Sequence, residues 1–220
     1  MVVVTHPTEF LDYRDQRVQD FVAKAIGDAT TRKDRAVRLF YAVRDGLHYE
    51  VSGQDLSREG LRASAIAARG QGFCAHKSIL YAAAVRAVGI PSRIVVSEVR
   101  NHLASPALKA LVGGDTFVHW LTSIQLGGRW LYVTPVFNKV LCRLYRMPPL
   151  EFDGESDARL HPFTGGEQME FLTEHGHFDD VDYDRLIGLM RSRHPGMFTD
   201  GPNGAVVPDA GALAAQATES

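Results

Sequence analysis

Residues 70–91 read GQGFCAHKSILYAAAVRAVGIP, and this stretch decides the fold. Its apolar residues recur at the spacing of one buried helical face, namely Leu80, Ala83, Ala84, Ala87 and Val88. Gly89 and Pro91 end the predicted helix, because a glycine after the last turn followed by a proline is a common stop. Cys74 lies at the helix start, where unpaired N–H groups and the helix dipole favour thiolate over thiol. The stretch therefore predicts a nucleophilic cysteine.

Composition sets the class of protein around this helix. The chain has 220 residues, of which 45% are hydrophobic, and a formal net charge of -2. These values predict one globular domain over residues 1–198, followed by a disordered tail over 199–220. We expect no nucleic-acid partner, because Lys and Arg do not cluster, and no membrane segment, because no apolar run is long enough. The N-terminus lacks a signal-peptide core, so we expect a cytoplasmic protein. The oligomeric state is left open.

Two cysteines are too few for a disulfide framework, and we expect both to be free thiols in a reducing compartment. Cys142 lies in VLCRL among apolar neighbours, which predicts a small buried hydrophobe. His76 follows Cys74 by two residues, but no second ligand pair stands at zinc spacing, so we predict no metal and no cofactor. Lys77, one turn on from Phe73, could lower the pKa of the thiol, but a solvated surface lysine is the simpler interpretation.

Elsewhere the pattern predicts helices first and strands later. Amphipathic helices are expected over 14–26 and, behind a capping box of Thr31 and Asp34, over 35–47. A short helix is expected before Gly70 and a strand over 93–99. Residues 147–168 are rich in turn formers and predict a surface excursion, and short closing helices are expected at MEFL (169–172) and over 182–193. Arg100 and Asn101 open a loop after the strand, which fits either substrate contact or an ordinary solvated loop.

The clearest hairpin lies over residues 117–137, where Gly127-Gly128 separates FVHWLTSIQL from RWLYVTPVF. A two-residue loop places Leu126 opposite Arg129 and predicts that His119 lies opposite Val136. Because side chains alternate between faces, Thr134 and Asn138 would then be the two diagonal neighbours of His119 on one face, roughly 7–8 Å away. A proline has no N–H to donate, so Pro135 weakens the ladder between these two positions.

Cysteine, then histidine, then a hairpin partner is the chain order of a nucleophilic site. The imidazole of His119 would take the thiol proton and return it to a leaving amine, while a third group holds the imidazole in the right tautomer. A histidine among apolar strand residues also fits a hydrogen-bonded core residue, and the spacing by itself leaves both interpretations open.

These residues carry a resemblance to a known family. The segments RAVRLFYAVRDGLHYE, GQGFCAHKSILYAAAVRAVGIPSRIVV and FVHWLTSIQLGGRWLYVTP resemble the core of the transglutaminase-like superfamily. The resemblance implies an α+β fold of the papain-like, transglutaminase-core type, with N-terminal helices packed on an antiparallel sheet. It also implies that Cys74 is the nucleophile and His119 the base of an acyl-transfer or amide-hydrolysing enzyme, whose partner is a peptide, protein or small amide.

The third catalytic position departs from the family pattern. Where the family has V-D-P-T, this chain has Val133-Thr134-Pro135-Val136. The sequence resembles a bacterial branch with T-P-x-F-N in place of V-D-P-T, so either Thr134 or Asn138 would orient the imidazole. Neither carries the charge that makes a carboxylate bond about twice as strong. A catalytically silent module that binds a peptide or partner protein is therefore the alternative function.

An oxyanion hole is expected to include the backbone N–H of Cys74 and one further donor. Gln71 and Tyr49 are candidates for that donor by residue type, and a structural role fits each of them as well.

Overall fold

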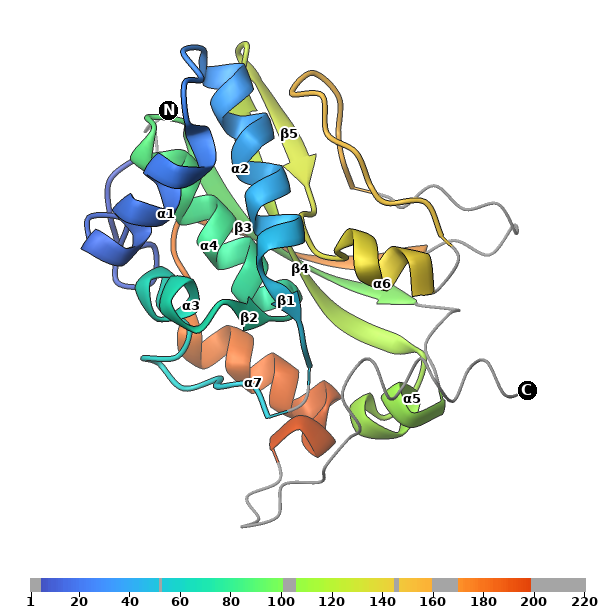
Figure 1. Ribbon diagram of the computed structural model, residues 1–220. Coiled ribbons are helices and arrows are strands. Elements are labelled where there is room, and N and C mark those ends of the chain that lie inside the picture. The colour runs from blue at the N-terminus through green and yellow to red at the C-terminus, as the bar shows by residue number, and fades with distance from the viewer. Residues whose placement is uncertain (1–4, 52, 101–105, 145–146, 160–169, 199–220) are drawn as a thin grey trace.

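The computed structural model of the chain describes residues 5–51, 53–100, 106–144, 147–159 and 170–198. Its helices are α1 (Gln16–Ile26), α2 (Arg32–Gly46), α3 (Ala63–Arg69), α4 (Cys74–Ala87), α5 (Pro106–Val112), α6 (Lys139–Leu144), α7 (Tyr183–Arg193) and the short 3-10 helix η1 (Pro195–Phe198). Its strands are β1 (His48–Tyr49), β2 (Gln71–Gly72), β3 (Ser92–Arg100), β4 (Thr116–Leu126), β5 (Arg129–Val133) and β6 (Glu170–Phe178). The N-terminal helices gather on one side of an antiparallel sheet, which confirms the predicted α+β class (Figure 1).

The main sheet has the strand order β5-β4-β3-β6, and each neighbouring pair is antiparallel. β4 is an inner strand and pairs with β3 over its whole length, which places Ser97 opposite His119. A second, two-stranded sheet joins β1 to β2 in parallel. The segment after α2 therefore lies directly beside residues 70–74, the turn that leads into Cys74, which we call the cysteine turn.

Helix α4 is the centre of the core. Every residue from Cys74 to Arg86 is buried, so the helix is enclosed on all sides rather than on the one face that the spacing predicts. It contacts β3 and β4 on the sheet side and α1, α2 and α3 on the other, as Figure 1 shows. A helix of small and apolar residues suits this place, because alanines let neighbouring elements approach closely while the helix still buries its whole circumference.

Local signals explain the two N-terminal helices. The Thr31 side chain accepts a hydrogen bond from the Asp34 N–H at 3.0 Å, which is the N-cap that the sequence predicts for α2. The Asp15 side chain caps α1 in the same way, through the Arg17 N–H. Each helix then turns one apolar stripe toward the core, made by Val18 and Val22 in α1 and by Ala36, Leu39, Phe40 and Val43 in α2.

Two predictions about the later part of the chain are wrong. The MEFL segment is not a closing helix, because residues from Glu170 onward form β6 and pair with the open edge of β3. Two register shifts interrupt this pairing, so the alternation typical of a strand is blurred in the sequence. The described part of the expected surface excursion, residues 147–159, instead contributes Leu150, Phe152 and Ala158 to the core, and residues 160–168 lie outside the described residues. The helix predicted over 182–193 is confirmed as α7, which begins one residue later.

The predicted disordered tail, residues 199–220, lies outside the described residues. In the described part of the chain, none of the helices combines the length and the apolar character needed to cross a membrane.

Candidate active site

The cysteine turn is fixed by its second glycine. Gly72 pairs with Tyr49 between β2 and β1, and a side chain there would place its Cβ 2.5 Å from the Cβ of His76. Only glycine fits at that distance, which explains the residue two places before the cysteine. His76 is itself buried, and its Nε2 lies 3.1 Å from the carbonyl oxygen of Asp55. The turn therefore delivers Cys74 to the first position of α4.

Cys74 is 8% exposed, and burial raises the pKa of its thiol to about 11. Hydrogen bonds to the sulfur from the backbones of Trp120, Ala75 and Cys74 itself lower the pKa, but they only partly offset desolvation. The predicted thiolate at a helix start is thus corrected, because burial outweighs the helix terminus. Cys74 rests as a thiol.

The sulfur reaches β4 because β5 ends early. The predicted hairpin register is confirmed from Leu126–Arg129 to Thr122–Val133, where the ladder stops. The Thr134 N–H then turns to the carbonyl of Ala158 at 2.9 Å, so the predicted pairing of His119 with Val136 is wrong. Pro135 follows directly and cannot donate to a ladder, which agrees with an end at this point.

Helix α4 occupies the place that β5 leaves. The Ser78 hydroxyl donates to the carbonyl of Trp120 at 2.9 Å, and the Trp120 N–H bonds to the Cys74 sulfur. Both backbone groups of a residue in an antiparallel strand point to the same side, so the two contacts together seal one edge position of β4. The first turns of the cysteine helix are therefore joined to the strand that carries His119.

His119 immediately precedes Trp120 and is 5% exposed. Its ring meets the edge of Phe171 on β6, with centroids 6.1 Å apart and planes at 79°. Side chains alternate along a strand, so His119 leaves the sheet on the face opposite to Trp120. The structure thus brings the Cys74 sulfur to the backbone of Trp120, the residue next to His119 on β4.

The two candidates for the orienting position differ in what they bind. Thr134 is 2% exposed, and its hydroxyl has no hydrogen-bond partner among the described residues. Asn138 is buried, and its Oδ1 accepts the Leu141 N–H at 2.8 Å, which makes it the N-cap of α6.

The remaining predicted residues lie around this centre. Gln71 forms β2 opposite His48, next to the cysteine turn. Tyr49 packs its ring against Phe137 with centroids 5.2 Å apart. Arg100 ends β3 and pairs with Glu170 on β6 at 2.8 Å, and Asn101 lies outside the described residues. Within the described ranges, no group of three or more His, Cys, Asp or Glu side chains is arranged to hold a metal ion.

Sequence reasoning missed two polar residues of α4, Ser78 and Lys77. Both are fully buried, although Lys77 was expected on the surface. The signal for them was present in the sequence, since each is a polar residue inside an otherwise apolar helix that directly follows the cysteine.

Comparison with known proteins agrees with this geometry. The family model described as the transglutaminase-like superfamily matches residues 19–135, just over half of the chain. The chain belongs to the transglutaminase-like superfamily. The matched segment of this superfamily member begins in α1 and ends at Pro135, so it contains both Cys74 and His119. Comparison with curated protein sequences finds no match.

Two solved structures are similar to this chain. A candidate cysteine protease from Cytophaga hutchinsonii has 15% sequence identity and a TM-score of 0.52, and the match covers 83% of this chain and 48% of that chain. This chain therefore spans about half the length of that structure. The arylamine N-acetyltransferase from M. tuberculosis has 14% identity and a TM-score of 0.47, with 86% and 73% of the two chains covered. At such identities the likeness to the first structure shows the fold alone.

Proposed function

We propose that this superfamily member is a cysteine-dependent enzyme that acts on a carboxamide or peptide bond, with Cys74 as nucleophile and His119 as general base. One observation carries the proposal. The Cys74 sulfur, at the start of α4, accepts a hydrogen bond from the backbone of Trp120, the residue that follows His119. We infer from this contact that Cys74 and His119, which are 45 positions apart in the sequence, meet at β4, and this supports acyl transfer through a thioester.

The reaction divides into two half-reactions. In the first, the imidazole takes the thiol proton while the sulfur bonds to the carbonyl carbon. The C–N bond then breaks, the imidazolium gives its proton to the leaving amine, and the acyl group remains on Cys74 as a thioester. In the second, water or an amine attacks the thioester with loss of its proton to His119, the C–S bond breaks, and the proton returns to sulfur. The substrate is a peptide, protein or small amide, and the acceptor decides between hydrolysis and transfer.

The resting thiol favours one order of events. Because burial holds the pKa of Cys74 at about 11, a preformed thiolate is rare at neutral pH. Proton transfer to His119 would therefore accompany attack, as in a serine hydrolase, rather than precede it. The developing oxyanion would accept hydrogen bonds from the Cys74 N–H and from a donor of Gln71 or Tyr49.

A second function has its own supporting observation. Thr134 supplies no charge to an imidazolium, and the Asn138 Oδ1 is already engaged by the Leu141 N–H. A module that binds a peptide or partner protein without turning it over would need neither residue as an orienting group. Both cysteines are free thiols, which suits the cytoplasmic location that we propose for either function.

Acylation by p-nitrophenyl acetate tests the proposal without a known substrate. We expect an acetyl thioester on Cys74 at neutral pH, located by peptide mass spectrometry and removed by hydroxylamine. His119→Ala should slow its formation by about 10²–10⁴-fold, the usual contribution of a general base. Cys142, which is buried and has no histidine partner in the described structure, serves as the internal control, and N-acetylcysteine as the free-thiol reference.

Two results would refute the proposed enzymatic function and favour the binding module. One is acetylation of Cys74 that is no faster than acetylation of N-acetylcysteine, and the other is an acetylation rate that His119→Ala leaves unchanged.

A further inference from the structure

Lys77 is an unusual residue for the middle of a core. It lies three residues after Cys74 on α4, within the same helical turn, and its side chain is 0% exposed. Burial of an amine is costly unless its donors are satisfied, and among the described residues the donors of Lys77 bind two backbone carbonyls. The Nζ donates to the carbonyl oxygen of Arg44 at 2.8 Å and to that of Val136 at 2.9 Å.

The two carbonyls belong to different parts of the fold. Arg44 lies in the last turn of α2, where carbonyls lack a partner within the helix. Val136 lies between β5 and α6, in the middle of residues 134–138, which we call the orienting segment because it carries both Thr134 and Asn138. One side chain thus ties the cysteine helix to α2 and to the orienting segment at once.

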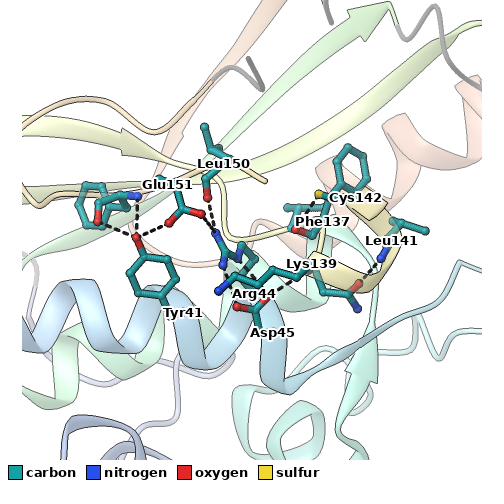
Figure 2. A network of polar contacts seen from close by, with 12 residues as sticks. Tyr41, Arg44, Asp45, Phe137, Lys139, Leu141, Cys142, Leu150 and Glu151 are labelled. Carbon is teal, nitrogen blue, oxygen red and sulfur yellow. Dashed lines mark hydrogen bonds and ion pairs between the residues drawn. The ribbon is translucent and has the colours of Figure 1, made fainter. Parts of the chain in front are cut away.

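The end of α2 makes a second connection to the same place. Asp45 accepts the Lys139 N–H at 3.0 Å, one residue beyond the orienting segment, and also binds the Arg44 guanidinium at 2.8 Å (Figure 2). Arg44 is fully buried and donates through Nη1 to the carbonyl of Leu150 at 2.6 Å. The end of α2 is therefore a fixed support, and the orienting segment is held on it from both sides.

The other contacts of the segment run elsewhere, and they include the packing of Phe137 on Tyr49 and the bond from the Leu141 N–H to Asn138. The Thr134 N–H bonds to Ala158, and the Val136 N–H closes a tight turn on Thr134 itself. Among the described contacts, the Lys77 bond to Val136 is the one that links the interior of the segment to the cysteine helix.

We propose that Lys77 is a positioning residue, which holds the orienting segment at a set distance from the cysteine helix and so determines how that segment meets His119. The part of this inference that concerns His119 rests on the proposed function, whereas the mechanical link does not. A hydrophobic side chain of equal length would fill the space and release the segment, which distinguishes this role from simple packing.

Lys77→Met tests the link, because methionine fills most of the same volume without donors. Arg86→Met is the matched control. Arg86 is a buried cation on the last turn of the same helix, and it donates to the carbonyls of Ser92 and Asp179, far along α4 from the orienting segment.

Amide hydrogen exchange tests the mechanical link between Lys77 and the orienting segment without requiring enzymatic activity. In Lys77→Met we expect the amides of Val136 and Lys139 to exchange about tenfold faster, which is the effect on local opening of losing one hydrogen bond. The exchange rates of the β3 and β4 amides should stay unchanged. Arg86→Met should leave Val136 and Lys139 unchanged. Equal protection in Lys77→Met and wild type, or an equal change in both variants, would overturn the proposal.

The rate of Cys74 acylation tests the consequence of this link for His119. We expect Lys77→Met to slow acetylation by about tenfold to a hundredfold, since small displacements of catalytic groups are that costly. In a His119→Ala background the same change should have no further effect, because the residue acts through the imidazole. If wild-type Cys74 is not acylated but exchange still quickens in Lys77→Met, the proposed function fails and the mechanical link stands. Additive effects of Lys77→Met and His119→Ala would refute the action on His119.

If Lys77→Met does not fold, NMR of the wild-type protein decides. The Nζ protons of Lys77 should be protected from exchange and coupled through their hydrogen bonds to the carbonyl carbons of Arg44 and Val136. Rapidly exchanging Nζ protons without these couplings would refute the link.

Discussion

Lys77 should leave a signature in the pH dependence of folding. Burial lowers the pKa of Lys77 from its usual 10.5 to about 7. Between these values the unfolded chain binds a proton at this residue that the folded chain does not, so the free energy of unfolding must rise with pH. From pH 7 to pH 9 the two pKa values give a gain of about 2 kcal/mol.

The rise in the free energy of unfolding stops near pH 9, because ionisation of the two thiols in the unfolded chain then lowers this free energy. Burial raises the pKa of Cys74 and of Cys142 from 9.0 to about 11, so above pH 9 the unfolded chain loses two protons that the folded chain keeps. Stability gained through Lys77 is therefore expected to peak near pH 9 and to fall beyond it.

Urea denaturation at pH 7, 8 and 9 measures this slope, provided that the m-value is constant across the series. Wild type and the Arg86→Met control should both gain stability, whereas Lys77→Met should lose roughly 1 kcal/mol, because the opposing effect of the two thiols is then uncompensated. A wild-type free energy that does not change from pH 7 to 9, or a slope that survives in Lys77→Met, would show that the amine is not held in a dry site.

Three substitutions test the rest of the site. Gly72→Ala should destabilise the fold by about 1–3 kcal/mol in urea denaturation, because its Cβ would overlap His76, and an unchanged midpoint would contradict the close approach. Asn138→Ala should cost about 1 kcal/mol for the lost cap, while Asn138→Asp keeps the cap and isolates any effect on acylation; equal stability of the two would argue against capping. Thr134→Asp should fold and acylate faster, since a carboxylate can stabilise the His119 imidazolium; unfolding at neutral pH would instead mean that nothing offsets the buried charge.

The parts of the fold that local chemistry determines could be predicted from the sequence. Gly127-Gly128 specifies a two-residue loop, and the loop in turn specifies the register of every pair up to Thr122–Val133. The family motif around Cys74 likewise places the cysteine at the first position of α4. Both predictions depend on residues that are close in sequence.

What escaped prediction depends on long-range contacts. The pKa of Cys74 follows from the depth of its burial, which no local motif encodes, and β6 is a strand because the edge of β3 offers it partners. Lys77 is buried because two carbonyls from distant segments converge on it. A polar residue in an apolar helix indicates such a site, but the identity of its acceptors requires the fold.

The early end of β5 also limits how a substrate can bind. An extended peptide often binds an enzyme by adding itself as a further strand to an exposed sheet edge. At Trp120 this route is closed, because the Ser78 hydroxyl and the Cys74 sulfur already occupy the carbonyl and N–H that such a peptide would need. In the proposed enzyme, a substrate beside the thiol would be recognised by its side chains and its scissile carbonyl rather than by β-augmentation along β4.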